Sequence, residues 1–299
     1  MPRKARVISS TGQYHIVVKS LKEIDLFRDN KDKVKYIEII NKYKTKYGFA
    51  IYAYCLMSNH GHFIIDCLGA DISKIMASIN LSYSQYYNRK YNRYGPVFKE
   101  RFHSTPIEDD RYMITVSAYI HNNPKDIPGY ERDVQSYPFS SLAEYIDETN
   151  EFGILTRSFL VNLIGFKYKR NKKQYLKLVR NCVDLEIKED IEFKKAESEY
   201  RSEKTFISRD HDPYEVINYV ANKLNEDPGN VYIKYRRAST RIRAVSCLLM
   251  NNFCNMSHRQ ICEVIGNITQ SGISYLTDKG LEIVMEERSF IEDFISIPT

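Results

Sequence analysis

The hydrophobic and polar positions in the first part of the chain follow two different periods. Residues 12–20 form an apolar, β-branched run that is typical of a strand. Residues 31–47 repeat apolar side chains at helical spacing, which predicts an amphipathic helix with a basic outer face. The apolar runs 50–57 and 60–67 are separated by two polar residues and predict a hairpin.

The following segments continue this alternation. Residues 71–91 have one apolar helical face and begin at Asp71, a residue type that caps helices. Residues 97–108 are predicted as irregular or extended chain, and a helix from about residue 109 to 121 stops before Pro124. The order strand, helix, hairpin, helix, strand, helix predicts an α+β fold. We expect an antiparallel sheet with helices on one face, close to a ferredoxin-like arrangement.

The pattern changes after about residue 150, where no clear strand period remains. Residues 157–180 are basic with helical spacing, and residues 186–204 are densely charged with mixed sign. Short helices, separated by breaker residues, follow from about residue 212. We therefore expect three parts: an α+β domain at 1–146, a basic and charged helical linker at 147–210, and an all-α domain at 211–299.

The last part has a recognisable order of elements. Residues 238–253 form an apolar helix, and Ser257 with Gln260 has the spacing of a capping box at the start of a short second helix. Residues 271–284 then form a third helix. This order resembles the helix-turn-helix of replication-initiator DnaA and Trp-repressor domains, which implies docking on duplex or hairpin DNA. A plain helical bundle that supports dimerisation is the alternative.

Composition excludes some classes of protein, and the charge distribution points to a partner. The chain has no run of 18 apolar residues, its basic start lacks the apolar stretch of a signal peptide, and its six cysteines form no CxxC pair. These features predict a cytoplasmic protein with reduced thiols and no membrane partner. Twelve Lys or Arg face five Asp or Glu in residues 1–50, and eight face one in residues 151–180. Such patches favour nucleic-acid docking over ordinary solvated faces.

The most informative triplet is His60-Gly61-His62. Residues i and i+2 of a strand face the same side, so both imidazoles can bind one ion. Imidazole suits first-row divalent metals, although such a pair also occurs by chance on surfaces.

A second pair, Tyr119 and Asn123, shares one face near the end of a predicted helix. Asparagine offers a carbonyl oxygen as a third ligand, and tyrosine offers a phenol whose free pKa is about 10. A nearby cation would favour the nucleophilic phenolate. A tyrosine packed in the core is the plain alternative, since the chain has 24 tyrosines.

Several blocks together resemble the REP-associated tyrosine transposases, which belong to the HUH, or insertion-sequence 200-like, single-strand transposases of bacteria. The resemblance covers roughly residues 1–146. The blocks are MPRKARV at the start, AYCLMSNHGHFII at 53–65, YNRKYNRYGPVFKERFHS at 87–104, AYIHNNP at 118–124 and SSLAEYI at 140–146.

This resemblance implies a site and a reaction. His60, His62 and Asn123 would bind a divalent metal ion, Mg²⁺ or Mn²⁺, and Tyr119 would be the nucleophile. The implied reaction cleaves and rejoins single-stranded or hairpin DNA through a 5′-phosphotyrosine link. Gly61 departs from the family, which has a bulky apolar residue there, and glycine would leave a small space beneath the sheet.

The remaining histidines, His15, His103 and His121, have no matched role and are interpreted as structural residues or phosphate contacts. Tyrosines 86, 91 and 94 lie among basic residues and are candidates for base stacking. Basic side chains near the start of the chain, in the 94–104 turn and in the all-α domain at 211–299 are candidate DNA contacts. They are Arg3, Lys4, Arg6, Lys99, Arg101, Arg236, Arg237, Arg241 and Arg243.

Two alternatives to an active transposase are open. A domesticated, non-catalytic protein that binds palindromic repeats would keep the basic patches but not the chemistry. A metal-binding structural protein would leave Tyr119 and the basic start unexplained. For both the active transposase and the domesticated binder, the expected partner is DNA and the expected location is cytoplasmic and nucleoid-associated. The chain is expected to act as a monomer or a homodimer.

Overall fold

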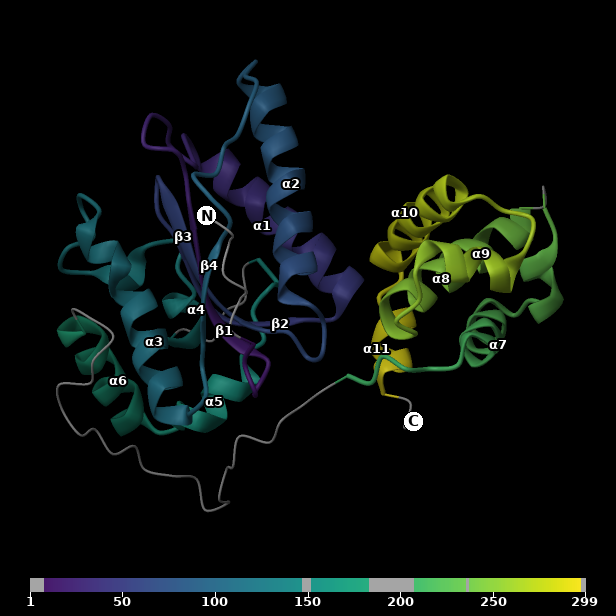
Figure 1. Cartoon of the computed structure of the whole chain (residues 1–299). Helices are drawn as coiled ribbons and strands as arrows, with labels where there is room; N and C mark the ends of the chain where they lie inside the picture. Colours follow the sequence, from purple (N-terminus) through teal and green to yellow (C-terminus); the bar gives the residue numbers. More distant parts are fainter. Residues whose placement is uncertain (1–7, 147–151, 183–206, 235–236, 297–299) are drawn as a thin grey trace. The chain divides into compact units, whose positions relative to one another are not determined.

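The computed structural model describes residues 8–146, 152–182, 207–234 and 237–296 (Figure 1). The chain divides into two compact units. The first comprises residues 1–41 and 49–205, and the second comprises residues 42–48 and 206–299. Among the described residues, no helix is long and apolar enough to cross a membrane.

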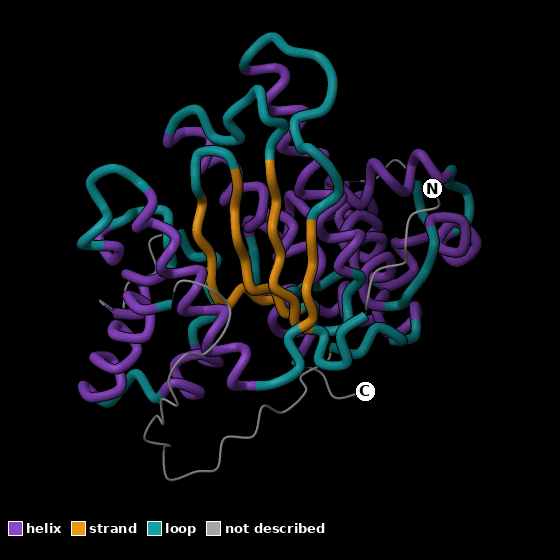
Figure 2. The backbone as a smooth tube through the Cα atoms, turned by 60° about the vertical axis from the view of Figure 1, so that its left-hand side comes forward, coloured by secondary structure: helices purple, strands orange, loops and turns teal. Residues whose placement is uncertain are grey.

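A four-stranded antiparallel sheet forms the centre of the first unit (Figure 2). Its strands are β1 (Gln13–Lys19), β2 (Ala50–Leu56), β3 (His60–Asp66) and β4 (His103–Pro106). Their order is β2-β3-β1-β4, so consecutive strands β2 and β3 pair as the expected hairpin. This order, with a helix in each crossover, is ferredoxin-like, and the predicted α+β class is confirmed.

Helices α1 (Asn30–Tyr47) and α2 (Ile72–Lys90) cover one face of this sheet (Figure 1). Tyr36 of α1 packs against Phe63 of β3 and against Tyr83 of α2, and all three side chains are buried. The Asp71 side chain accepts a hydrogen bond from the Ser73 backbone and caps α2, as its position in the sequence predicted.

Gly61 lies in this packed layer and does not leave the expected space. A Cβ at this position would lie 3.1 Å from Leu56 Cδ2, 3.2 Å from Phe63 Cε2 and 3.4 Å from Val18 Cγ2. These neighbouring side chains therefore fill the volume that a larger residue would need.

The opposite face of the sheet is covered by α3 (Asp110–Asn122), so the helices occupy both faces rather than one. Asp109 caps this helix, and a short 3-10 helix, η1 (Asn123–Asp126), continues it. The face under α3 carries the odd-numbered residues of β1 and the even-numbered residues of β3, because Val17 pairs with His62.

The first unit extends past residue 146, where the sequence indicated a boundary. Further elements are η2 (Val134–Ser136), α4 (Leu142–Ile146), α5 (Ser158–Ile164) and α6 (Lys169–Asn181). Residues 158–181 were expected in a linker, but α5 and α6 pack against α3. The buried Tyr175 of α6 is hydrogen bonded to His121 Nδ1 at 2.7 Å and donates to Ser117 Oγ at 2.9 Å. Helix α6 therefore has a basic outer face and an inner face that packs in the core of the first unit.

The second unit is all-α over its described residues. Its elements are α7 (Pro213–Leu224), η3 (Pro228–Tyr232), α8 (Arg237–Phe253), α9 (His258–Ile265), α10 (Gln270–Glu286) and α11 (Ser289–Ile295). The predicted capping box of Ser257 and Gln260 is present at α9. Gly280 lies where α10 meets α8, and a Cβ there would overlap the Ala244 carbonyl oxygen. The two helices pack this closely only because residue 280 has no side chain.

Candidate functional site

The sheet face beneath α3 carries a row of imidazoles. His60 and His62 of β3 point to the same side, with ring centroids 5.0 Å apart. His15 of β1 shares that face, and its ring stacks on His62 at 5.4 Å between centroids. His60 pairs with Lys19 in the register of β1 and β3, so a lysine also belongs to this face. The structure therefore brings together the predicted imidazole pair and a third imidazole.

His15 is hydrogen bonded to one ring nitrogen of His62. His15 Nε2 lies 3.1 Å from His62 Nδ1, and the two residues are only 4% and 5% exposed. Burial lowers the pKa of His15 to about 4 and that of His62 to about 2. Both rings are therefore neutral at neutral pH, which is the form that binds metals. The sequence interpretation missed His15 because the strand register that places it beside His62 joins residues far apart in the chain.

Tyr119 lies over these imidazoles from α3. Its ring centroid is 5.7 Å from that of His62 and 6.1 Å from that of His15, with the rings at steep angles in both pairs. The side chain is half-buried, so the phenol is neither enclosed in the core nor fully solvated. The phenol ring therefore lies on the sheet face that carries the imidazoles.

Asn123 completes the cluster one turn after Tyr119. Its Nδ2 donates to the Tyr119 carbonyl at 2.9 Å, which directs the amide nitrogen back to the helix. Burial and the nearby Lys19 lower the pKa of His60, while hydrogen bonding to Asn123 partly raises it again. Asn123 therefore lies beside His60, an arrangement that the family resemblance implies.

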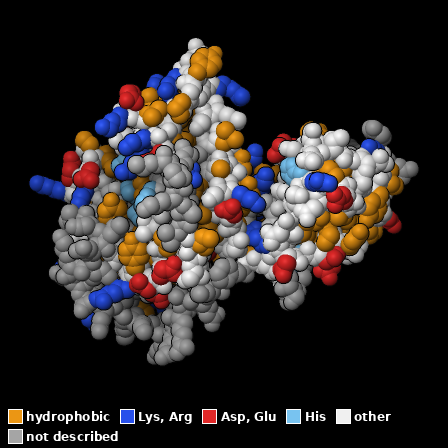
Figure 3. Space-filling model, in the orientation of Figure 1, with side chains coloured by type: hydrophobic (Ala, Val, Ile, Leu, Met, Phe, Trp, Pro, Cys, Tyr) orange, Lys and Arg blue, Asp and Glu red, His pale blue; other side chains and the backbone are white. Residues whose placement is uncertain are grey.

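A basic cavity adjoins His60. It has a volume of about 380 Å³, and three lysines line it: Lys19, Lys22 and Lys99. Lys99 was predicted as a phosphate contact, whereas Lys19 and Lys22 were not. Figure 3 shows histidine surface on this unit, with lysine and arginine side chains around it. The arrangement can neutralise the charge of an anionic chain that enters beside the imidazoles.

The other singled-out residues of the first unit have different surroundings. Arg101 is exposed and lines a second cavity, and His103 is exposed on β4. His121 is fully buried, and its Nε2 is 2.8 Å from Ser141 Oγ, so it is structural. Tyr86 and Tyr91 were candidates for base stacking, but both hydroxyls donate to the buried Asp32. Only Tyr94 of that group is largely exposed.

In the second unit the arginines of α8 differ in exposure. Arg241 is exposed, as a DNA contact would be. Arg243 is 5% exposed and its Nη1 donates to the Ile233 carbonyl at 3.2 Å, which corrects the expectation of an exposed phosphate contact. It lines a cavity of about 510 Å³ with Lys234 and the first turn of α10. Residues Arg3, Lys4, Arg6 and Arg236 and the side chain of Arg237 lie outside the described part of the chain.

Comparisons with known proteins address the first unit. A family model described as "Transposase IS200 like" matches residues 8–123. A solved structure described as "Structure of the REP associates tyrosine transposase bound to a REP hairpin" is similar at 19% identity and a TM-score of 0.41. That similarity covers 52% of this chain and 88% of the other. No curated protein matched the chain. The matched segment, residues 8–123, carries the imidazole row, Tyr119 and Asn123, and this part of the chain is similar to the IS200-like transposases.

Proposed function

We propose that this protein is a metal-dependent DNA transposase that cleaves and rejoins single-stranded or hairpin DNA through Tyr119. The observation that carries the proposal is the convergence of a half-buried phenol with two neutral imidazoles on one sheet face. The match of residues 8–123 to the IS200-like transposase family model supports the same reaction class. The three lysines beside His60 supply the positive charge that a DNA backbone requires.

The donor set fits a divalent ion. His60 and His62 would bind it through neutral imidazoles, and Asn123 would add an amide oxygen. Over the described part of the chain, no three His, Cys, Asp or Glu side chains are grouped to hold a metal. A site made of His60, His62 and Asn123 would leave coordination positions open for a substrate oxygen. A bound Mg²⁺ or Mn²⁺ would polarise a non-bridging oxygen of the scissile phosphate.

The protein's own side chains would then perform the exchange. The phenol of Tyr119 loses its proton and its oxygen attacks phosphorus, so the bond from phosphorus to the 3′ oxygen breaks. That oxygen takes a proton and leaves as a free 3′-hydroxyl, while the 5′ phosphate is esterified to Tyr119. Attack of another 3′-hydroxyl on this ester reverses the step and joins new DNA. Lys19 and Lys99 would hold the neighbouring phosphates throughout.

We also propose that the second unit docks on duplex or hairpin DNA as a helix-turn-helix. Helices α9 and α10 are joined by the short segment 266–269, and α10 begins at the Thr269 cap. Ser274 and Tyr275 are exposed in the first half of α10, where a recognition helix contacts bases. Lys234, which lines the cavity at this end, would contact a backbone phosphate.

A covalent adduct tests the catalytic proposal. The protein is incubated with palindromic, hairpin-forming single-stranded DNA and Mn²⁺ or Mg²⁺, and an SDS-resistant complex is sought by gel electrophoresis. Wild type and Tyr112→Phe, a half-buried tyrosine of the same helix, should form the complex, and Tyr119→Phe should not. Extension of the released 3′ end by a polymerase checks the polarity of the link. If wild type binds the DNA but forms no adduct with any tested sequence and metal, the protein is a non-catalytic binder.

A further inference from the structure

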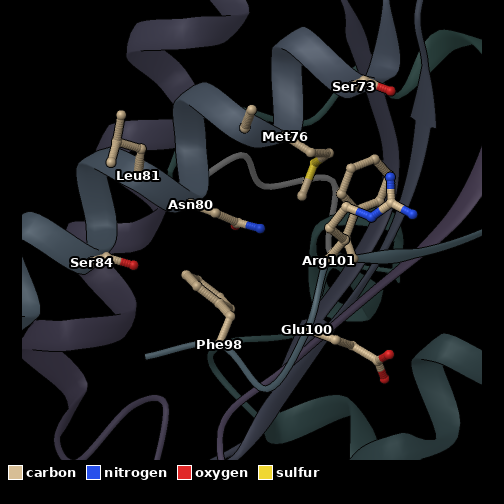
Figure 4. Close-up of a pocket in the computed structure, with 10 residues that line it drawn as sticks. Ser73, Met76, Asn80, Leu81, Ser84, Phe98, Glu100 and Arg101 are labelled. Carbon is tan, nitrogen blue, oxygen red and sulfur yellow. The ribbon is translucent and has the colours of Figure 1, made fainter. Parts of the chain in front are cut away.

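A cavity on the α2 side of the sheet takes no part in the chemistry described above (Figure 4). Its volume is about 370 Å³, which is at the small end of the range of about 300–1,000 Å³ for ligand pockets. Its walls come from α2 and from the segment that precedes β4. Met76, Ala77, Leu81, Phe98 and Phe102 form the apolar part of the lining, and polar or charged residues, among them Asn80, Glu100 and Arg101, form the rest.

The accessible lining is mainly apolar and includes an aromatic ring. Met76 and Phe102 are buried, whereas Phe98 is half-buried with its ring beside the cavity (Figure 4). Leu81 stands at the rim and is 63% exposed, which is unusual for a large aliphatic side chain on a helix that packs against a sheet. A flat, apolar ligand inserted beside Phe98 would cover Leu81 and find a stacking surface.

Asn80 supplies a directed polar group inside this apolar cavity. The hydroxyl of Tyr36 donates to Asn80 Oδ1 at 3.0 Å, and burial raises the pKa of that phenol, so it stays a donor. The amide is therefore fixed with its oxygen turned away and its Nδ2 toward the cavity (Figure 4). Nδ2 has no hydrogen-bond partner among the described residues. It is available to an acceptor that a ligand brings.

The segment that forms one wall also lines the basic cavity beside His60. Phe98 bridges to Ser20, and the next residue, Lys99, donates its backbone N–H to the Lys19 carbonyl at 3.0 Å. The Lys99 side chain lines the basic cavity, while Phe98 lines the apolar one. A strand whose phosphates lie on Lys19 and Lys99 would therefore pass the entrance beside Phe98. Arg101, exposed at this entrance next to the carboxylate of Glu100, would provide a further phosphate contact.

We propose that this cavity binds one unpaired keto base, guanine or thymine, of the DNA strand that occupies the His60 site. The inference rests on the proposed function, since it assumes that the strand is DNA. Stacking on Phe98 and a hydrogen bond from Asn80 Nδ2 to O6 of guanine or O4 of thymine would recognise this ligand. Adenine and cytosine carry an amino donor at the corresponding position and are the poorer occupants. The cavity makes the protein selective for a base outside the hairpin stem.

Photocross-linking locates the base. Oligo(dT) that contains 4-thiothymidine is bound to the full chain in EDTA, so that no cleavage occurs, and is irradiated. Peptide mass spectrometry should find cross-links in residues 76–84 or 98–102. Cross-links confined to other segments would overturn the base site.

Affinity measurements test the recognition by each wall. Fluorescence anisotropy measures the affinities for oligo(dT) and for oligo(dA) of equal length. Self-stacking of oligo(dA) affects every variant equally, so the ratio of the two affinities is compared between variants. Phe98→Ala should weaken oligo(dT) binding about tenfold through loss of stacking. Asn80→Asp keeps the acceptor for Tyr36 but removes the donors, and should abolish the preference for oligo(dT). Gln85→Ala, an exposed change on α2 outside the cavity, should leave both affinities unchanged.

The outcomes separate this inference from the proposed function. Thermal unfolding of each variant first establishes that it is folded. If the ratio of oligo(dT) to oligo(dA) affinity is the same in wild type, Asn80→Asp and Phe98→Ala, the base site is excluded, even when the Tyr119 adduct forms. If wild type recognises the base but never forms an adduct, only the catalytic proposal fails. Failure of wild type to bind either oligonucleotide would overturn the base site but not the catalytic proposal, which hairpin-forming DNA tests separately.

Discussion

His15 Nε2 lies 3.1 Å from His62 Nδ1, so one buried imidazole fixes the orientation of another. With Nδ1 engaged, His62 has only Nε2 left for a ligand. A partner of this kind fixes the tautomer and the ring orientation of a metal-binding histidine. His15 is therefore a positioning residue for the site around His60, His62 and Asn123.

Replacing His15 with Ala should weaken Mn²⁺ binding by about 10- to 100-fold, because the His62 ring loses its orienting partner. Electron paramagnetic resonance of free Mn²⁺ during a titration measures this without any reaction. His15→Gln, which retains a hydrogen-bonding group, should recover part of the affinity. His103→Ala, an exposed histidine on the same sheet face, is the control. Equal affinities in wild type and His15→Ala would refute the role.

Gly61 should resist enlargement because Leu56, Phe63 and Val18 already fill the volume around it. Gly61→Val should reduce the free energy of unfolding by about 1–3 kcal/mol through overpacking, and Gly61→Ala by less. Urea unfolding of the full chain measures the change. Adding Leu56→Ala to Gly61→Val should return part of the loss, since it opens space beside residue 61. A valine that costs nothing would show that this layer rearranges freely.

Gly280 should be the least replaceable glycine of the second unit. A Cβ at this position overlaps the backbone of Ala244, so Gly280→Ala must separate α8 from α10. We expect a loss of about 3 kcal/mol, at the upper end of overpacking effects. Calorimetric unfolding measures it. Gly272→Ala, whose new methyl would meet only the flexible Ile268 and Thr269 side chains, should cost much less. Similar losses in both variants would contradict the close helix approach.

His121 should make stability depend on pH. Burial lowers its pKa to about 3, below the ordinary value of 6.5, so the unfolded chain binds the proton first. Stability from this group is complete above pH 6.5 and falls as the pH drops toward 3. Between pH 7.5 and 5.5 the loss should be about 1.4 kcal/mol. His121→Gln, which cannot be protonated there, should show a smaller loss than wild type in calorimetry at the two pH values.

Local chemistry in the sequence was sufficient to predict many elements. The 50–67 hairpin, the Asp71 cap and the Ser257–Gln260 capping box depend on neighbours in the chain, and each is present. Strand and helix periodicity, combined with a family resemblance, also predicted that Tyr119 and His62 lie close together, and their ring centroids are 5.7 Å apart.

What the sequence did not reveal depends on contacts between distant segments. His15 reaches His62 through strand register, which hydrophobic periodicity does not specify. The packing of α6 was hidden by its many basic residues, whose long side chains leave only a narrow apolar stripe around Tyr175. Arg243 was assigned to the surface by its charge, although it lies on the inner side of α8. The cavity beside Asn80 forms because residues 98–102, which precede β4, pack against α2, and the sequence pattern does not specify this contact.

The hydrogen bonds of Tyr175 and of the Cys182 carbonyl attach α6 to α3, the helix that carries Tyr119. Asn122, three residues after Tyr119, donates to that carbonyl at 2.7 Å. A fragment that stopped at residue 123, where the family match ends, would expose His121 and leave Asn122 without this acceptor. A piece of the first unit that keeps these contacts must extend at least to residue 182, and domain grafts or chimaeras should be cut beyond that residue.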